Sequence, residues 1–475
     1  MNFSTLTNLM SHQRAAVAKM LPSRIGGLFM EQGTGKTRVV IELAKLRAHK
    51  ISKVIIFCPV SLKRVWRDEI LKHADCAPDL IHVFDGHTSE RKLPVAFWYI
   101  VGIESMSASN RVALTVNALM DDKAFAVADE STYIKGHRSM RTARLTAYAE
   151  TARYRMIMTG TPLTNGVVDL FAQMRFLSPK ILGYKSFYSF ANNHLEYSKK
   201  FKGMIVRALN TEVLAEKIGP YVYQVTKDEC LDLPNKIYKR RYFDRTHSQA
   251  CAYQQAKQEL LDIDGDNYEA MTYVIFRLFT ALQQITSGFW SRRDVDNADA
   301  GLECIEFPHR RLECLAEVLH EIPVNEKVVI WAKYHYDIAG IAGTLADEFP
   351  GQPAAFFHGN LSERERNEQL DKFRREARFF VATPSCGGHG LTLNEAAHHV
   401  FYNNGFKFSE RLQAEDRSHR IGQTRPVIYW DIICSDTIDE RIIKALANKE
   451  DVANSFRREV EKVKGEKLKA RLLAL

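Results

Sequence analysis

A glycine-rich loop between an apolar run and a helical stretch constrains the fold of this chain more than any other feature. Residues 33–37 read Gly-Thr-Gly-Lys-Thr, the apolar run 28–30 precedes them, and the helical stretch 38–47 follows. Glycines allow backbone N–H groups to close around phosphate oxygens, and the N-terminus of the following helix adds positive potential. This order of strand, glycine loop and helix predicts a phosphate-binding lobe.

Each residue of the loop has its own predicted role. The Lys36 amine is expected to reach the β- and γ-phosphates of ATP, and the Thr37 hydroxyl to ligate Mg²⁺. Met30 stands where the full G-x-x-x-x-G-K-[ST] pattern has its leading glycine, so a plain glycine turn before a helix is the alternative. The flanking strand and helix favour nucleotide binding. The expected nucleotide-binding residues of the loop are Gly33, Thr34, Gly35, Lys36 and Thr37.

A pair of carboxylates follows the apolar run 125–128, which reads as a buried strand. Ligands of open parallel sheets bind at the carboxyl ends of the strands, where Asp129 and Glu130 are expected to lie. Asp129 is predicted to hold Mg²⁺, and Glu130 to orient and deprotonate the attacking water. Such a pair is more often a solvated helix cap when it stands alone, but the phosphate loop upstream favours catalysis.

Short apolar runs alternate with amphipathic helical stretches in two parts of the chain. This alternation predicts an α/β fold in which helices cover parallel sheets. A length of 475 residues also exceeds one ordinary core, so two domains are expected. The strand-like runs of the first part are 54–58, 97–101, 125–128 and 155–158. Those of the second part are 328–331, 354–357, 379–382, 399–402 and 427–433.

The charge and the hydropathy of the chain limit its partners. The 66 basic and 57 acidic residues leave a net charge of +9, which suits a polyanionic partner without requiring one. Because no apolar run approaches the ~18 residues of a membrane span, we expect no membrane partner. The N-terminus lacks the pattern of a signal peptide, so the cytoplasm, with association to the nucleoid, is the expected location.

An ordered series of further motifs resembles the Swi/Snf-type ATPases of helicase superfamily two. The resemblance covers most of the chain, and the string 413–423, Gln-Ala-Glu-Asp-Arg-Ser-His-Arg-Ile-Gly-Gln, is its sharpest signal. In the first part it rests on His12-Gln13, Pro59-Val60-Ser61-Leu62 with Trp66, Thr159-Gly160-Thr161-Pro162 and Leu282-Gln283-Gln284-Ile285. In the second part it rests on His358-Gly359, Thr383, Gly387-Gly388-His389-Gly390-Leu391 and Thr437-Ile438-Asp439-Glu440.

The resemblance implies two RecA-like parallel-sheet lobes in tandem, with a helical insertion between them and a C-terminal helical tail. We expect an ATP-binding lobe over residues 1–235 and a helical insertion with a linker over 236–300. A helicase lobe is expected over 301–452, and a basic helical tail or brace over 453–475.

The resemblance also implies the remaining site residues. Arg417 and Arg420 of the second lobe would act on the γ-phosphate across a cleft, as catalytic residues together with Glu130 and Lys36. Further ATP contacts are expected from Gln13, Gly390 and Gln413. Residues near the nucleic-acid track are expected to be Ser61, Thr161, Thr383 and Gly388, although each could equally be a capping hydroxyl or a turn glycine.

The implied function is an ATP-dependent motor, expected to act as a monomer, that translocates on double-stranded DNA and remodels protein–DNA or DNA structures. Protein partners could supply targeting. A strand-separating or annealing helicase and a nucleotide-gated DNA-binding scaffold with weak hydrolysis are the alternatives. Thr132 stands where the family usually has a histidine that relays between the ATP and nucleic-acid sites, so the coupling between these sites could differ.

Overall fold

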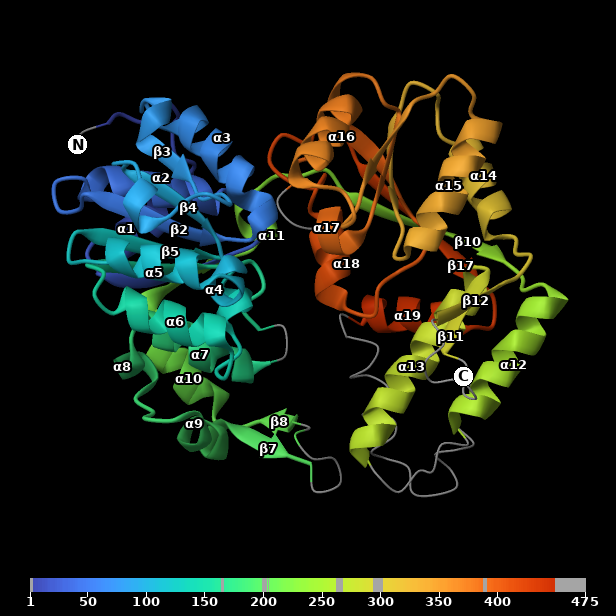
Figure 1. The fold of residues 1–475 in the computed structure, drawn as a ribbon, viewed down its shortest axis with the longest axis horizontal. Coiled ribbons are helices and arrows are strands. Elements are labelled where there is room, and N and C mark those ends of the chain that lie inside the picture. The colour runs from blue at the N-terminus through green and yellow to red at the C-terminus, as the bar shows by residue number, and fades with distance from the viewer. Residues whose placement is uncertain are drawn as a thin grey trace. The chain divides into compact units, whose positions relative to one another are not determined.

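The computed structural model describes residues 3–163, 166–198, 203, 205–261, 268–293, 302–387 and 391–448 (Figure 1). The chain forms two compact units, which divide between Leu233 and Pro234. The expected site residues Gly388 and Gly390 lie outside the described residues, as do the expected tail 453–475 and most of the expected linker after residue 293.

The first unit is built on a seven-stranded sheet in the order β3-β4-β2-β5-β6-β1-β9, with every pair of neighbours parallel. Its central strands are almost entirely apolar because helices cover both faces. The strands are β1 Ile25–Met30, β2 Lys53–Cys58, β3 Ile81–Val83, β4 Trp98–Gly102, β5 Ala124–Asp129, β6 Tyr154–Met158 and β9 Val222–Val225.

Two layers of helices cover this sheet. Val17, Val40 and Trp66 of the first three helices pack into one buried cluster, whereas Val112 and Leu145 belong to the cluster on the other face. The helices of the first face are α1 Ser11–Met20, α2 Lys36–Arg47 and α3 Lys63–His73. Those that follow are α4 Ser105–Ala108, α5 Asn110–Leu119, α6 Met140–Ala149, α7 Leu170–Leu177, α8 Pro179–Leu182, α9 Phe187–His194, α10 Thr211–Ile218 and α11 Lys227–Cys230. A hairpin is formed by β7 Leu195–Tyr197 and β8 Ile205–Ala208.

The second unit contains a six-stranded parallel sheet in the order β10-β17-β16-β13-β15-β14. Its strands are β10 Lys236–Phe243, β13 Lys327–Trp331, β14 Ala354–Phe357, β15 Phe379–Ala382, β16 Ala396–Phe401 and β17 Val427–Cys434. Its helices are α12 His247–Leu261, α13 Tyr268–Thr286, α14 Arg311–His320, α15 His335–Glu348, α16 Glu363–Arg375, α17 Pro384–Gly387, α18 Phe408–Glu415 and α19 Ile438–Ala447. The hairpin β11 Phe289–Arg293 and β12 Leu302–Glu306 precedes α14. Two parallel α/β sheets in tandem confirm the predicted fold class.

The segment that we expected to be an insertion between the lobes begins with a strand of the second sheet. β10 pairs with β17 along its whole length, from Lys236 opposite Val427 to Phe243 opposite Cys434. Because it is an edge strand, most of its side chains are exposed, and its sequence therefore lacks the apolar run of a central strand. The second unit thus starts at Pro234, before this strand.

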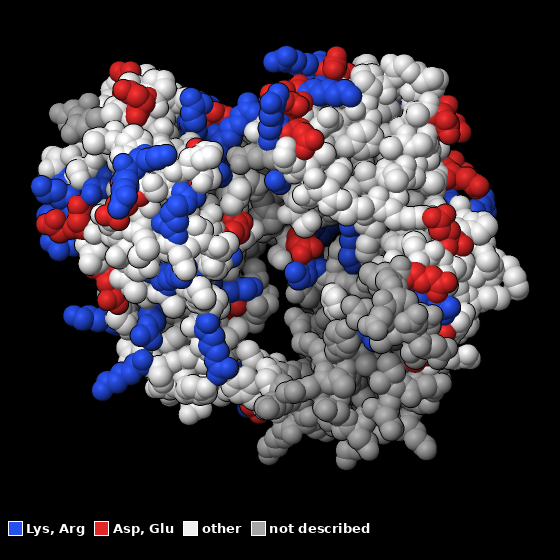
Figure 2. Space-filling model, in the orientation of Figure 1, with Lys and Arg blue, Asp and Glu red and all other residues white. Residues whose placement is uncertain are grey.

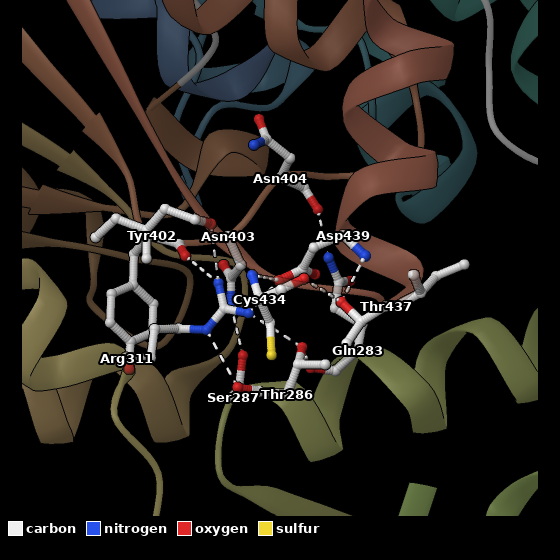
Figure 3. Close-up of polar contacts among 12 residues, drawn as sticks. Gln283, Thr286, Ser287, Arg311, Tyr402, Asn403, Asn404, Cys434, Thr437 and Asp439 are labelled. Atoms are coloured by element: carbon white, nitrogen blue, oxygen red, sulfur yellow. Dashed lines mark hydrogen bonds and ion pairs between the residues drawn. The ribbon is translucent and has the colours of Figure 1, made fainter. Parts of the chain in front are cut away.

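A buried arginine ties the helices of the second unit to the sheet (Figure 3). The fully buried Arg311 guanidinium donates to Thr286 O at 3.2 Å and to Tyr402 O at 2.6 Å, and it pairs with the Asp439 carboxylate. Asn403 donates to the Ser287 hydroxyl at 3.0 Å in the same cluster. These bonds fix the C-terminal end of α13 against β16 and α19. The family motif 282–285 lies in the last turn of α13.

Candidate ATP site and arginine segment

The phosphate loop joins β1 to α2 and depends on two glycines in the left-handed backbone region. Gly33 has φ +80° and Gly35 has φ +84°, a conformation that other residues adopt only with strain. A Cβ atom on Gly35 would also lie 2.2 Å from Gln13 Nε2. A side chain at position 35 would therefore strain the backbone and displace the Gln13 amide.

Helix α1 is hydrogen-bonded directly to the loop. Gln13 Nε2 donates to Thr34 O at 3.2 Å, and Gln13 Oε1 accepts from Met10 N at 3.0 Å. His12 Nε2 donates to the same Thr34 carbonyl at 2.8 Å. The structure thus places the predicted Gln13 beside the loop, together with His12, whose sequence context gave no sign of this contact.

Lys36 and Thr37 are the first two residues of α2. The Lys36 amine lies inside the loop and donates to Met30 O at 2.9 Å and to Glu31 O at 3.2 Å. Thr37 is half-buried in the first helical turn, and the Thr34 hydroxyl donates to Glu31 O at 2.7 Å. The ammonium, the helix N-terminus and the glycine N–H groups therefore gather at one end of β1, as phosphate binding requires.

The carboxylates of the predicted metal and base residues lie at the carboxyl end of β5. Burial, reinforced by the neighbouring Glu130 carboxylate, raises the pKa of Asp129 to about 6. Glu130 has φ +47° and closes the strand, and its Oε1 lies 3.5 Å from Gln32 Nε2. Glu130 Oε2 is buried and has no hydrogen-bond partner among the described residues, so it can accept a proton from a ligand water.

Trp66 of α3 positions the Asp129 carboxylate. The buried indole donates from Nε1 to Asp129 Oδ2 at 2.8 Å, while Asp129 Oδ1 accepts from Glu130 N at 2.9 Å. The residue was predicted only as part of a family motif, because a contact across 63 positions leaves no local pattern. Each carboxylate oxygen is thus oriented by one N–H donor.

We expect Trp66→Phe to raise the Mg²⁺ concentration needed for half-maximal nucleotide binding. The reason is that the buried Asp129 carboxylate loses a charge-assisted hydrogen bond worth about 1.5–3 kcal/mol. The measurement is a titration of Mg²⁺ against binding of a fluorescent ATP analogue. Trp98→Phe is the matched control, since Trp98 is equally buried and its Nε1 has no partner among the described residues. Equal Mg²⁺ midpoints in the two variants would contradict a positioning role.

The segment after Glu130 is linked through α7 to the motif Thr159-Gly160-Thr161-Pro162. Ser131 Oγ donates to Gln173 Oε1 at 2.6 Å, and Gln173 Nε2 donates to Pro162 O at 3.0 Å. Gln173 is fully buried and was not predicted. It connects these two motifs directly, next to Thr132.

The expected nucleic-acid residues are distributed over both units. Ser61 lies in the short 3₁₀ turn Val60–Leu62 after β2, and Thr161 follows β6. Thr383 follows β15 in the second unit and is buried. The hydroxyls of Thr161 and Thr383 have no hydrogen-bond partner among the described residues. All three lie at carboxyl ends of parallel strands, where ligands bind.

The predicted arginines lie in the second unit, directly after α18. Arg417 is buried and donates from Nε to the carbonyl of Gln413 at 2.8 Å, and Arg420, three residues later, is half-buried. We call residues 413–420, which contain Gln413, Arg417 and Arg420, the arginine segment.

Ser418 anchors the arginine segment to the sheet. Its hydroxyl donates to Leu393 O at 2.6 Å and accepts from His399 Nε2 at 2.7 Å. Trp331 Nε1 donates to His399 Nδ1 at 3.0 Å, so the neutral ring must carry its proton on Nε2. Complete burial lowers the pKa of His399 to about 3.

This histidine should make the second unit sensitive to acid. The unfolded imidazole takes up a proton near pH 6.5 but the folded one only near pH 3, so stability falls as the pH drops through this window. We expect His399→Gln to remove this part of the loss, on the order of 2–4 kcal/mol, from unfolding curves measured between pH 7 and 4. Parallel pH profiles of the wild type and the variant would contradict the assignment.

Two matches to protein families show the family to which this chain belongs. Residues 11–288, more than half of the chain, match the SNF2-related domain, and residues 310–422 match the helicase conserved C-terminal domain. The chain belongs to the SNF2-related family. Membership confirms the predicted family and the predicted class of enzyme, an ATP-dependent ATPase of the helicase type.

Relatives of this SNF2-related chain are longer proteins. The putative ATP-dependent helicase/translocase YwqA of Bacillus subtilis is 24% identical over 444 residues, which cover 88% of this chain and 45% of YwqA. The human DNA annealing helicase and endonuclease ZRANB3 is 24% identical over 466 residues, 92% of this chain and 40% of ZRANB3. The chain thus spans less than half the length of these curated relatives.

The solved helicase domain of Pyrococcus furiosus Hef resembles the chain in fold. Its TM-score is 0.54 at 15% identity, and the alignment covers 92% of this chain and 97% of that domain. None of the helices that the structure describes has both the length and the apolar character of a membrane span.

In this SNF2-related chain, a buried charge network stabilises the helix that leads to the arginine segment. Arg411 pairs with Glu415 at 2.7 Å and also with Asp431 of β17. Although burial opposes ionisation, the Arg411 and Lys236 charges lower the pKa of Glu415 to about 2. Lys236 and Tyr238 of β10 donate to Glu415 at 3.0 and 2.8 Å.

The start of the second unit is bonded to the same segment. His419 Nε2 donates to the carbonyl of Pro234 at 2.8 Å, directly before β10. The first residues of the second unit and the arginine segment therefore form one hydrogen-bonded layer.

Proposed function

We propose that this chain is the core of an ATP-dependent motor that translocates on double-stranded DNA and remodels protein–DNA or DNA structures. The observation that carries the proposal is that residues expected to hydrolyse ATP lie in both units. The phosphate loop and the Asp129–Glu130 pair belong to the first unit, and the arginine segment belongs to the second. A reaction that needs both units can couple hydrolysis to their relative motion.

In this mechanism the first unit binds ATP. Lys36 and the N–H groups of the loop hold the β- and γ-phosphates, and Gln13 contacts the base while its amide braces Thr34. Glu130 accepts the proton of the attacking water at its unpartnered Oε2. Arg417 and Arg420 stabilise the charge that develops on the transferred phosphoryl group.

The oxygen ligands at the site fit Mg²⁺. Thr37 offers a hydroxyl in the first turn of α2, and Asp129 offers a buried carboxylate whose orientation Trp66 fixes. Oxygen donors of this kind are those that Mg²⁺ prefers, with phosphate oxygens completing its shell. Bound Mg²⁺ supplies charge neutralisation for the phosphates.

Duplex DNA is the proposed track. The family, the positive net charge of +9 and the similarity to ZRANB3, a DNA annealing helicase, support it. A motor that advances without regard to sequence should hold phosphates rather than base edges.

The decisive measurement is ATP turnover with duplex DNA, single-stranded DNA and RNA at equal nucleotide concentration. We expect the strongest stimulation by duplex DNA. Strongest stimulation by RNA would overturn the proposal. The name of ZRANB3 favours a second candidate, an annealing motor, and strand-displacement and strand-annealing assays separate it from a pure translocase.

A further inference from the structure

Four arginines of the first unit have no acidic partner among the residues that the structure describes. These residues, which we call the arginine face, are Arg138, Arg141, Arg144 and Arg175. Arg138 and Arg175 are exposed, and the other two are half-buried. None of the four forms an ion pair with a carboxylate among the described residues. Figure 2 shows Lys and Arg side chains gathered over the face of the first unit on which α4, α6 and α7 lie.

Hydrogen bonds to uncharged groups order three of these guanidinium groups without neutralising them. Arg138 Nη2 donates to the Tyr188 hydroxyl at 2.6 Å, and Tyr188 itself is 65% exposed. Arg144 donates to Met106 O at 2.9 Å, and Arg175 to Lys185 O at 3.5 Å. Arginines preordered in this way retain their full charge for an external anion.

Aromatic rings pack against two members of the arginine face. Arg141 lies over Tyr133 at 5.7 Å and Arg175 over Phe171 at 6.0 Å. Phe171 meets His137, whose ring stacks on Phe187 at 3.6 Å. These rings connect Arg175 to α9, whose Tyr188 is the partner of Arg138.

The arginine face continues into the segment that carries Ser61. Arg141 Nη2 lies 3.4 Å from the Ser107 hydroxyl of α4, just after Glu104. Glu104 Oε2 in turn accepts from Val60 N at 3.0 Å, next to Ser61. These elements follow β2, β4 and β5 and so lie at the carboxyl edge of the sheet, where ligands bind.

We propose that the arginine face binds the phosphate backbone of duplex DNA and extends the track on the first unit from Ser61 across α4 and α6 to α9. The proposal rests on the proposed function, because it names the surface that holds the DNA. Guanidinium groups that have no acidic partner among the described residues are free to bind phosphate oxygens, which take a large share of the hydrogen bonds in protein–DNA complexes.

The test compares two double variants that each remove two positive charges. Arg138→Gln with Arg175→Gln changes the arginine face. Arg24→Gln with Lys50→Gln is the matched control, because both residues are exposed and precede β1 and β2 at the opposite edge of the sheet. The dissociation constant of a fluorescent DNA duplex is measured for the full chain between 50 and 200 mM salt. Over that range the affinity of a protein that contacts several phosphates falls by ~10³-fold or more, so the slope can be measured.

We expect the slope of log affinity against log salt to become shallower by about 2 in the arginine-face variant, and affinity at 100 mM salt to fall at least ~10-fold. The control should keep the wild-type slope. Melting temperature and binding of a fluorescent ATP analogue verify that both variants are folded.

If the wild type binds duplex DNA and the two folded variants show equal slopes of log affinity against log salt, the arginine face does not bind DNA. The proposed function would still stand. An unchanged DNA slope combined with weakened binding of a polyglutamate probe would equally overturn it, in favour of an acidic protein partner. A wild-type chain that does not bind duplex DNA would instead overturn the proposed function itself.

Discussion

Replacing Arg420 by alanine is expected to lower DNA-stimulated ATP turnover by about 10³ to 10⁵-fold while leaving ATP affinity nearly unchanged. An arginine that acts on the phosphoryl transition state has an effect of this size, equivalent to roughly 4–7 kcal/mol. Arg420 is half-buried, so its removal should disturb the segment less than removal of the buried Arg417. Arg417→Ala should lower turnover similarly, and Arg417→Lys separates the loss of charge from the loss of packing.

Turnover at saturating ATP and duplex DNA, together with equilibrium nucleotide binding, checks this expectation. Arg425→Ala is the control, because Arg425 lies shortly after the arginine segment but pairs with Glu326 at 2.7 Å and is 46% exposed. It should change turnover by no more than a few-fold. A large loss of ATP affinity in Arg420→Ala would argue that this arginine binds the ground state instead.

Glu130→Gln is the second change with a large expected effect. The amide keeps the shape of the side chain and can keep its contact with Gln32, but it cannot accept the proton of the attacking water. General-base catalysis contributes about 10² to 10⁴-fold, so turnover should fall by that factor while ATP binding remains. The variant should therefore accumulate in the ATP-bound form.

Single-turnover hydrolysis measures the expected loss of rate, and equilibrium nucleotide affinity measures the expected retention of ATP binding. Glu42→Gln is the matched control, since Glu42 is a buried carboxylate on α2 that pairs with Arg38 at 2.8 Å. It should lose stability rather than catalytic rate. Unchanged turnover in Glu130→Gln would remove the assignment of the base.

The sequence predicted those parts of the site that are continuous in the chain. The phosphate loop could be predicted because its glycines, lysine and helix are adjacent, and the structure places Lys36 and Gly35 accordingly. Gln13 was predicted from resemblance alone, and its bond to Thr34 spans 21 positions. The roles of Gly388 and Gly390 stay predictions.

The supporting contacts could not be predicted because they join strands that neighbour each other only in the folded sheet. The bonds of Trp66 to Asp129 and of His399 to Ser418 depend on the order of the strands, which no local spacing encodes. β10 lies in the segment 236–300, which was predicted as a helical insertion with a linker. Its membership of the second sheet depends on pairing with β17, nearly two hundred residues away.

The hydrogen-bonded layer at the start of the second unit has a mechanical consequence. A pull on the chain at Pro234 acts first on β10 and, through His419 and Lys236, on the helix end that bears the arginines. Tension in this strand should therefore change the position of the arginine segment. A force-spectroscopy experiment that stretches the chain at this junction would thus apply load directly to the segment that carries Arg417 and Arg420.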